Sequence, residues 1–232
     1  MILSANQPYF FPFPGIFLKS FLSDIFVVLD EVQFPRGTTW LTRNRFKNDQ
    51  GTIWMTIPVW KKGIGLQKIN DVKICYEGRW QKKHLASLRS AYARSPYLRN
   101  HIDFAERIFL SEFERLIDLN LTILRYLKKH LLINTKIILL SELGIEATGI
   151  HLLLEVCRRL GADSYLAQLP AKKYLDANLF RDAGISLKFF SIPSLVYPQL
   201  WGDFIPNLSA FDLLLNCGPK AHEILIAKQK FF

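Results

Sequence analysis

Residues 1–30, MILSANQPYFFPFPGIFLKSFLSDIFVVLD, contain the pattern that decides the fold. An apolar strand is expected at residues 1–4, a helix at 13–23 after a proline-rich loop, and an apolar, β-branched strand at 25–29. This order predicts a βαβ unit with parallel strands. Because ligands bind beyond the carboxyl ends of parallel strands, Gln7 and Asp30 are expected beside a site.

Between residues 32 and 75 the pattern changes to short polar–aromatic alternation with glycine turns, which indicates an antiparallel excursion. Residues 40–47 are expected to form one of its strands. Strand alternation places Arg43 and Arg45 on one face and Asn44 on the other. Paired guanidinium groups favour binding of phosphate or carboxylate, although a solvated basic strand is the alternative.

The remaining chain alternates again between helical and strand patterns, which predicts an α/β fold with a mostly parallel sheet, flanking helices and the antiparallel excursion. No repeat or linker divides the sequence, so residues 1–232 are interpreted as one domain. Helices are expected near 81–93, 151–160, 171–183 and 209–216, strands at 136–140, 164–166 and 186–190, and a long amphipathic stretch at 104–131, interrupted by Asn120.

Composition narrows the class of protein. Half of the residues are hydrophobic, so the chain can bury a core, and no apolar run reaches the ~20 residues of a membrane span. The proline-rich N-terminus does not resemble a secretory signal, and we expect a cytoplasmic protein. A net charge of +10 favours an anionic partner. Nucleic acid is the less favoured choice, because the basic residues form no continuous run.

Candidate reactive residues gather in the first part of the chain. Asp30 and Gln33 follow a buried strand, where a carboxylate can act as a base or orient a ligand, and His84 is the other candidate base. Cys75, Cys157 and Cys217 are expected to be buried free thiols. Metal-binding and cofactor-binding motifs are absent, so neither a metal nor a cofactor is predicted.

Several segments together resemble the WbqC-like family of bacterial proteins. They include QPYFFPFPGIF, LDEVQF, TWLTRNRFK, AYARSPY, LGADSYLAQLPAKKYLD and LSAFDLLLNCG, in order along nearly the whole chain. The resemblance implies a role in cell-surface polysaccharide gene clusters, with transfer of an amino acid such as glycine onto an amino sugar. The positions that match the family are Gln7, Pro8, Asp30, Gln33, Trp40, Arg43, Asn44, Arg45, His84, Tyr92 and Tyr97.

The leading hypothesis is therefore an acyltransferase that forms an amide on the amine of a nucleotide-linked sugar. Asp30 or His84 is the candidate base, with Gln7 or Asn44 as oxyanion donor. The two arginines would clamp the diphosphate. A module that binds a sugar nucleotide or carrier protein without catalysis is one alternative. A carrier-protein-dependent amide-forming enzyme of secondary metabolism is another.

Overall fold

A computed structural model describes residues 1–192 and 195–227. Its main sheet has five strands in the order β5-β2-β1-β6-β7, and all neighbouring strands run parallel. The strands are β1 (Ile2–Asn6), β2 (Ile25–Val28), β5 (Lys136–Leu139), β6 (Ser164–Gln168) and β7 (Ser186–Phe190). The helices are α1 (Pro14–Phe21), α2 (Trp80–Ala91), α3 (Leu98–Leu110), α4 (Leu116–His130), α5 (Gly149–Leu160), α6 (Ala177–Asp182), α7 (Ala210–Cys217) and α8 (Lys220–Ile226). The predicted α/β class is confirmed.

The βαβ unit at the N-terminus is the centre of this sheet. β1 pairs in parallel with β2, with Leu3 opposite Ile25, and α1 connects the two strands. From β1 the chain moves outward to β2 and β5, then returns to β6 and β7 on the other side of β1. The direction of winding therefore changes between β1 and β6, and ligands of parallel sheets bind at such a change, beyond the carboxyl ends of the strands.

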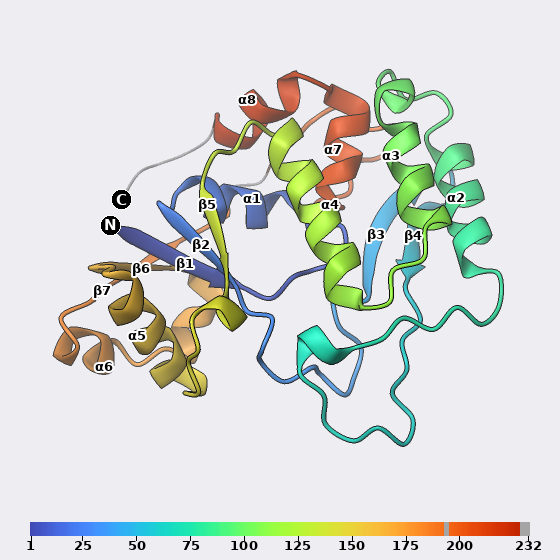
Figure 1. Cartoon of the computed structure of the whole chain (residues 1–232). Helices are drawn as coiled ribbons and strands as arrows, with labels where there is room; N and C mark the ends of the chain where they lie inside the picture. The colour runs from blue at the N-terminus through green and yellow to red at the C-terminus, as the bar shows by residue number, and fades with distance from the viewer. Residues whose placement is uncertain (193–194, 228–232) are drawn as a thin grey trace.

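The two faces of the sheet pack against different helices, as Figure 1 shows. Leu3 and Val27 belong to a core that includes Val156 of α5 and Phe180 of α6. Phe26 contributes to the larger core on the opposite face, which includes residues of α1, α4, α7 and α8. Successive strand residues enter different cores because their side chains alternate between the faces. This explains why β2, with the sequence IFVV, is wholly apolar.

The antiparallel excursion is confirmed as a separate two-stranded sheet of β3 (Arg43–Asn48) and β4 (Gly51–Thr56). The strand begins later than the sequence pattern predicts. The Thr42 amide donates to the Thr39 carbonyl oxygen at 3.2 Å, so a turn occupies the residues before Arg43. Gly51 has a φ of +102°, a backbone conformation that glycine adopts without a steric penalty.

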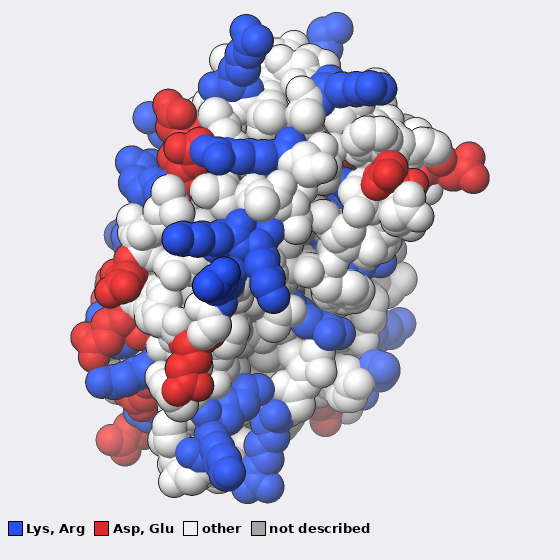
Figure 2. Space-filling view, turned by 90° about the vertical axis from the view of Figure 1, so that its right-hand side faces the viewer, with Lys and Arg blue, Asp and Glu red and all other residues white. Residues whose placement is uncertain are grey.

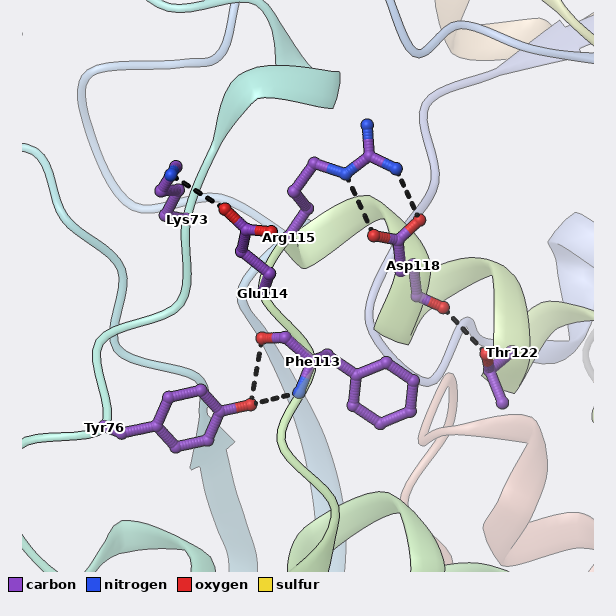
Figure 3. A network of polar contacts seen from close by, with 7 residues as sticks. All are labelled: Lys73, Tyr76, Phe113, Glu114, Arg115, Asp118 and Thr122. Carbon is purple, nitrogen blue, oxygen red and sulfur yellow. Dashed lines mark hydrogen bonds and ion pairs between the residues drawn. The ribbon is translucent and has the colours of Figure 1, made fainter.

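The amphipathic stretch at residues 104–131 forms parts of two helices, because residues 111–115 bond to another segment. Figure 3 shows that Tyr76 Oη accepts from the Phe113 amide at 2.7 Å, while Lys73 pairs with Glu114 at 2.8 Å. The Leu116 amide also donates to Val72 at 2.8 Å. The backbone amides of Phe113 and Leu116 thus bond to residues 72–76. These bonds replace the helical hydrogen bonds that would join α3 to α4.

The last helix before β7 and the three cysteines can be compared with the predictions from the sequence. The helix expected at 171–183 is shorter: a 3₁₀ segment, Leu169–Lys173, comes first, and α6 begins after Asp176, whose carboxylate caps it. All three cysteines are buried and free, as predicted. In residues 1–192 and 195–227, no helix is long and apolar enough to cross a bilayer.

A buried loop, residues 7–13, leads from β1 into α1 and determines much of the remaining arrangement. Phe10 and Phe11 are fully buried, so the carbonyl groups around them need hydrogen bonds from the protein. Asn44 Nδ2 donates to the carbonyl oxygens of Phe10 and Phe11 at 3.0 and 2.7 Å. Asn120 Nδ2 donates to Pro8 at 2.7 Å. Asn120, which interrupts the apolar stripe of α4, therefore has a structural explanation.

We predict that Asn120→Ala destabilises the protein. The substitution removes donors from Pro8 and from Leu41, which Asn120 reaches at 2.9 Å. Leaving two buried carbonyl groups unpaired is expected to cost about 2–4 kcal/mol of unfolding free energy, measured by urea titration. Asn100→Ala on the exposed face of α3 is the matched control and is expected to change stability by less than ~0.5 kcal/mol. Equal stability of both variants would contradict this role.

Candidate functional site

A cavity of about 850 Å³ lies beyond the carboxyl ends of β1, β2 and β5. Gln7 enters its wall directly after β1, and Glu31 and Gln33 enter it after β2. Ser141 and Glu146, which follow β5, also line it, and Lys68 and Thr148 add further polar groups. We call this the strand-end cavity. Its position is where open parallel sheets bind ligands, as the first 30 residues predict.

Asp30 lies beneath this cavity and does not line it. Its side chain is 2% exposed, and it accepts hydrogen bonds from the Ser141 amide at 3.0 Å and from Ser141 Oγ at 2.6 Å. The hydroxyl thereby gives its only proton to Asp30, so Ser141 can only accept a hydrogen bond from a ligand. The two hydrogen bonds from Ser141 to Asp30 fix the orientation of the Ser141 side chain.

Glu31 and Gln33 are held in the wall by a second segment of chain. The Ile69 amide donates to Val32 at 3.0 Å, and Gln33 forms an antiparallel bridge with Lys68. Lys68 Nζ also lies 3.0 Å from Glu31 Oε1, and this hydrogen bond and charge raise the pKa of Lys68. The cavity thus contains an ion pair, and the Glu146 carboxylate adds a further acceptor.

The arginines of β3 lie in a different place from Gln7. Arg45 and Trp40 line a second cavity, of about 500 Å³, together with Phe13 and Tyr197. We call this the hairpin cavity. The sequence predicts one converging site, whereas the structure places Gln7 and Gln33 in one cavity and Trp40 and Arg45 in another. The reason is the buried loop at residues 7–13, which has Gln7 in the strand-end cavity and Phe13 in the hairpin cavity.

Arg43 and Arg45 lie on one face of β3 and Asn44 lies on the other, as predicted. The face that carries Asn44 is the buried one. The Asn44 amide nitrogen bonds the buried loop, and Asn44 Oδ1 accepts from the Arg45 amide at 2.8 Å. With 1% of its surface exposed, Asn44 is not available to a ligand as an oxyanion donor. On the other face, Lys47 Nζ donates to the Asp203 carbonyl oxygen at 2.6 Å and is also buried.

His84, in α2, lines neither cavity. Its Nε2 is 2.8 Å from the Thr56 carbonyl oxygen and 3.1 Å from the Thr56 amide. Burial lowers the pKa of His84, and the bond to Thr56 partly opposes this change. The contact joins α2 to the end of β4, so the imidazole has a structural partner.

Tyr92 belongs to a buried network whose centre is Asp212 of α7. Tyr92 and Tyr197 each donate to one oxygen of Asp212 at 2.7 Å, and Tyr92 Oη accepts from the Lys47 amide. Burial raises the pKa of Asp212, while the two tyrosine hydroxyls lower it. Because Tyr197 lines the hairpin cavity, the network fixes one wall of that cavity.

Tyr97 lies at a third cavity, of about 460 Å³, which His101 and His130 also line. Gly218 packs against its ring so closely that a Cβ would lie 2.4 Å from it. His101 Nδ1 is 2.7 Å from Tyr126 Oη, and its ring centroid lies 4.9 Å from that of His130. The residues named by the sequence are therefore spread over three cavities, the buried core and, for Arg43 and His84, partly exposed positions outside both.

Comparison with known proteins identifies the family. The sequence profile of the WbqC-like protein family matches residues 7–224. The chain belongs to the WbqC-like protein family. An uncharacterized protein of Mycobacterium tuberculosis is 30% identical to this WbqC-like chain over 222 residues, which cover 94% of this chain and 95% of that protein. No solved structure matches the chain.

Ser141 and Glu146 of this WbqC-like protein are cavity residues that the sequence analysis does not select. Both residues follow the strand predicted at 136–140, and a position after a strand is the reason for which Gln7 and Asp30 are selected. The sequence pattern does not show which strands are neighbours in the sheet. β5 pairs with β2, and only this pairing brings Ser141 to Asp30.

For this WbqC-like protein we predict an acid-dependent loss of stability that involves His101. Burial, together with the charge of nearby His130, lowers the pKa of His101 to about 4. A histidine with a lowered pKa binds its proton more tightly in the unfolded state. The free energy of unfolding is therefore expected to fall as the pH decreases from about 6.5 to 4, by up to about 3 kcal/mol.

Urea titrations at several pH values between 4 and 7 measure this loss. His101→Gln is expected to make the pH dependence shallower, because the titrating group has been removed. His151→Gln, at an exposed position of α5, is the control and is expected to keep the wild-type slope. An unchanged slope in His101→Gln would contradict the assignment.

Proposed function

We propose that this WbqC-like protein is a cytoplasmic acyltransferase that forms an amide on the amine of a nucleotide-linked amino sugar. The observation that carries the proposal is the chemistry of the strand-end cavity. Carboxylates of Glu31 and Glu146 and carboxamides of Gln7 and Gln33 line one space at the carboxyl ends of parallel strands. Acceptors of this kind suit an amino group, which carries protons as an ammonium ion.

The orientation of Ser141 supports the same ligand. Its hydroxyl donates to Asp30 and therefore offers only lone pairs to the cavity. An ammonium group has three donors, which Ser141, Glu146 and the second carboxylate oxygen of Glu31 can accept, since the first oxygen of Glu31 is paired with Lys68. Gln7 has a carboxamide that also donates, so it is the candidate to bind the oxygen of the acyl group.

The reaction requires a proton acceptor and an activated donor. A carboxylate of the cavity takes a proton from the ammonium, and the free amine attacks the carbonyl carbon of an acyl thioester or ester. A C–N bond forms as the C–S or C–O bond breaks, and the thiolate or alkoxide leaves and takes up a proton. The donor is a carrier-protein thioester or an aminoacyl ester of tRNA.

A second candidate function is a binding module without catalysis. Both bases expected from the sequence have structural partners: Asp30 bonds Ser141, and His84 bonds the backbone of Thr56. A protein that only holds a sugar nucleotide or a carrier protein for a partner enzyme needs no base. The two functions predict the same ligand and differ in turnover.

Mass spectrometry separates the two functions. Purified protein is incubated with an aminoacyl or acyl thioester and a nucleotide-linked amino sugar, and the mass of the sugar nucleotide is followed. We expect the mass to increase by the acyl group. Glu31→Gln and Glu146→Gln are expected to lower the rate at least about tenfold each, as removal of a proton acceptor does.

Glu77→Gln, at an exposed position outside the cavity, is the matched control and should keep the wild-type rate. Full turnover in both cavity variants would show that the reaction occurs elsewhere. Binding of the sugar nucleotide with no mass change for any of the donor classes would contradict the transferase and support the binding module.

A further inference from the structure

One face of the β3–β4 sheet carries Arg43, Arg45 and Trp54, and Trp40 of the turn before β3 packs against Trp54. We call these four residues the Trp–Arg ladder. The ring centroids of Trp40 and Trp54 are 5.7 Å apart, with an interplanar angle of 31°. Arg43 Cζ lies 4.1 Å from the centroid of Trp54, and Arg45 Cζ lies 5.9 Å from that of Trp40. Each indole thus has a guanidinium group close to its ring.

The ladder remains open to solvent. Trp40 is 41% exposed and Trp54 is 43% exposed, which is unusual for the most hydrophobic aromatic side chains. Neither Arg43 nor Arg45 pairs with a carboxylate in the described parts of the chain. Two uncompensated positive charges therefore lie beside exposed aromatic rings.

Arg45 is fixed in place by the backbone. Its Nη2 donates to the carbonyl oxygens of Pro206 and Asn207 at 3.3 and 3.1 Å. Its Nε is buried but has no hydrogen-bond partner among the described residues. A buried donor without a partner is costly, and such a donor in the wall of a cavity favours an acceptor supplied by a ligand.

We propose that the Trp–Arg ladder and the adjoining hairpin cavity bind a nucleobase together with its phosphates. An indole face stacks on any base, and such stacking contributes strongly and with little sequence preference. Guanidinium groups form paired hydrogen bonds to phosphate oxygens. Arg45 is part of both the ladder and the cavity wall, so a base stacked on Trp40 has its phosphates directed toward Arg45.

The net positive charge of the protein suits a phosphorylated ligand. Figure 2 views the side on which β3, β4 and α2 lie, and Lys and Arg side chains are more numerous there than Asp and Glu. This agrees with the net charge of +10. A nucleoside diphosphate and an unpaired nucleotide of an RNA share the chemistry that the ladder recognises.

The inference deepens the proposed function, and rests on it, because a nucleotide-linked acceptor or an aminoacyl ester of tRNA would supply the base. The strand-end cavity and the ladder are lined by different residues. Binding at the ladder can therefore be measured without turnover, and failure of one proposal is distinguishable from failure of the other.

Isothermal calorimetry tests the ladder with uridine diphosphate, adenosine diphosphate and a short single-stranded RNA. Trp40→Ala and Trp54→Ala are each expected to weaken binding about 5- to 150-fold, the range for loss of one stacked base. Trp60→Ala is the matched control: it is 43% exposed but lies outside the ladder, and its affinity should stay within about twofold. Arg45→Ala is expected to weaken binding, and Arg43→Lys to restore part of what Arg43→Ala loses.

The relative affinities of the diphosphates and the RNA distinguish the source of the base. Tighter binding of the diphosphates than of the RNA assigns the site to a nucleotide-linked sugar, and the reverse assigns it to RNA. Ribose 5-phosphate carries a phosphate but no base. If it binds as tightly as uridine diphosphate, the proposal that a base stacks on the ladder is wrong. Absence of binding, or equal affinity of wild type and both tryptophan variants, would overturn the site.

Discussion

The structure depends on one constraint: the loop after β1 passes through the hydrophobic core, and its carbonyl groups must be satisfied without water. Phe10 and Phe11 are fully buried, and two asparagines donate to the carbonyl groups around them. Asn44 comes from β3 and Asn120 from α4, so the loop holds the small sheet and a long helix against the main sheet. An unpaired buried carbonyl would cost more than most single contacts supply.

This loop also separates the candidate sites. Gln7 leaves the sheet into the strand-end cavity, and Phe13 reaches the hairpin cavity six positions later. An acceptor that consists of an amine-bearing sugar and a nucleotide has two parts of different chemistry. The two cavities offer carboxylates for one part and an arginine with aromatic rings for the other.

Local patterns predicted the strands and the faces of β3 because alternation is a property of the backbone itself. They did not separate exposed from buried polar residues. Arg45 and Asn44 are adjacent and both polar, yet one lines a cavity and the other bonds a buried loop more than 30 positions earlier in the chain. The partner that decides between these roles is distant in sequence. The same is true of Asp30, whose partner Ser141 follows β5.

By itself, the sequence determined the α/β class and the parallel unit at the N-terminus, which follow from periodicity and residue order. It also determined the family, through the resemblance of its motifs. Tertiary structure decided the strand order, the pairing of Asp30 with Ser141, and the break between α3 and α4 at residues 111–115. The physical reason is that periodicity records only which side of an element is apolar. Which polar groups meet depends on long-range pairing, where each buried donor and acceptor must find a partner.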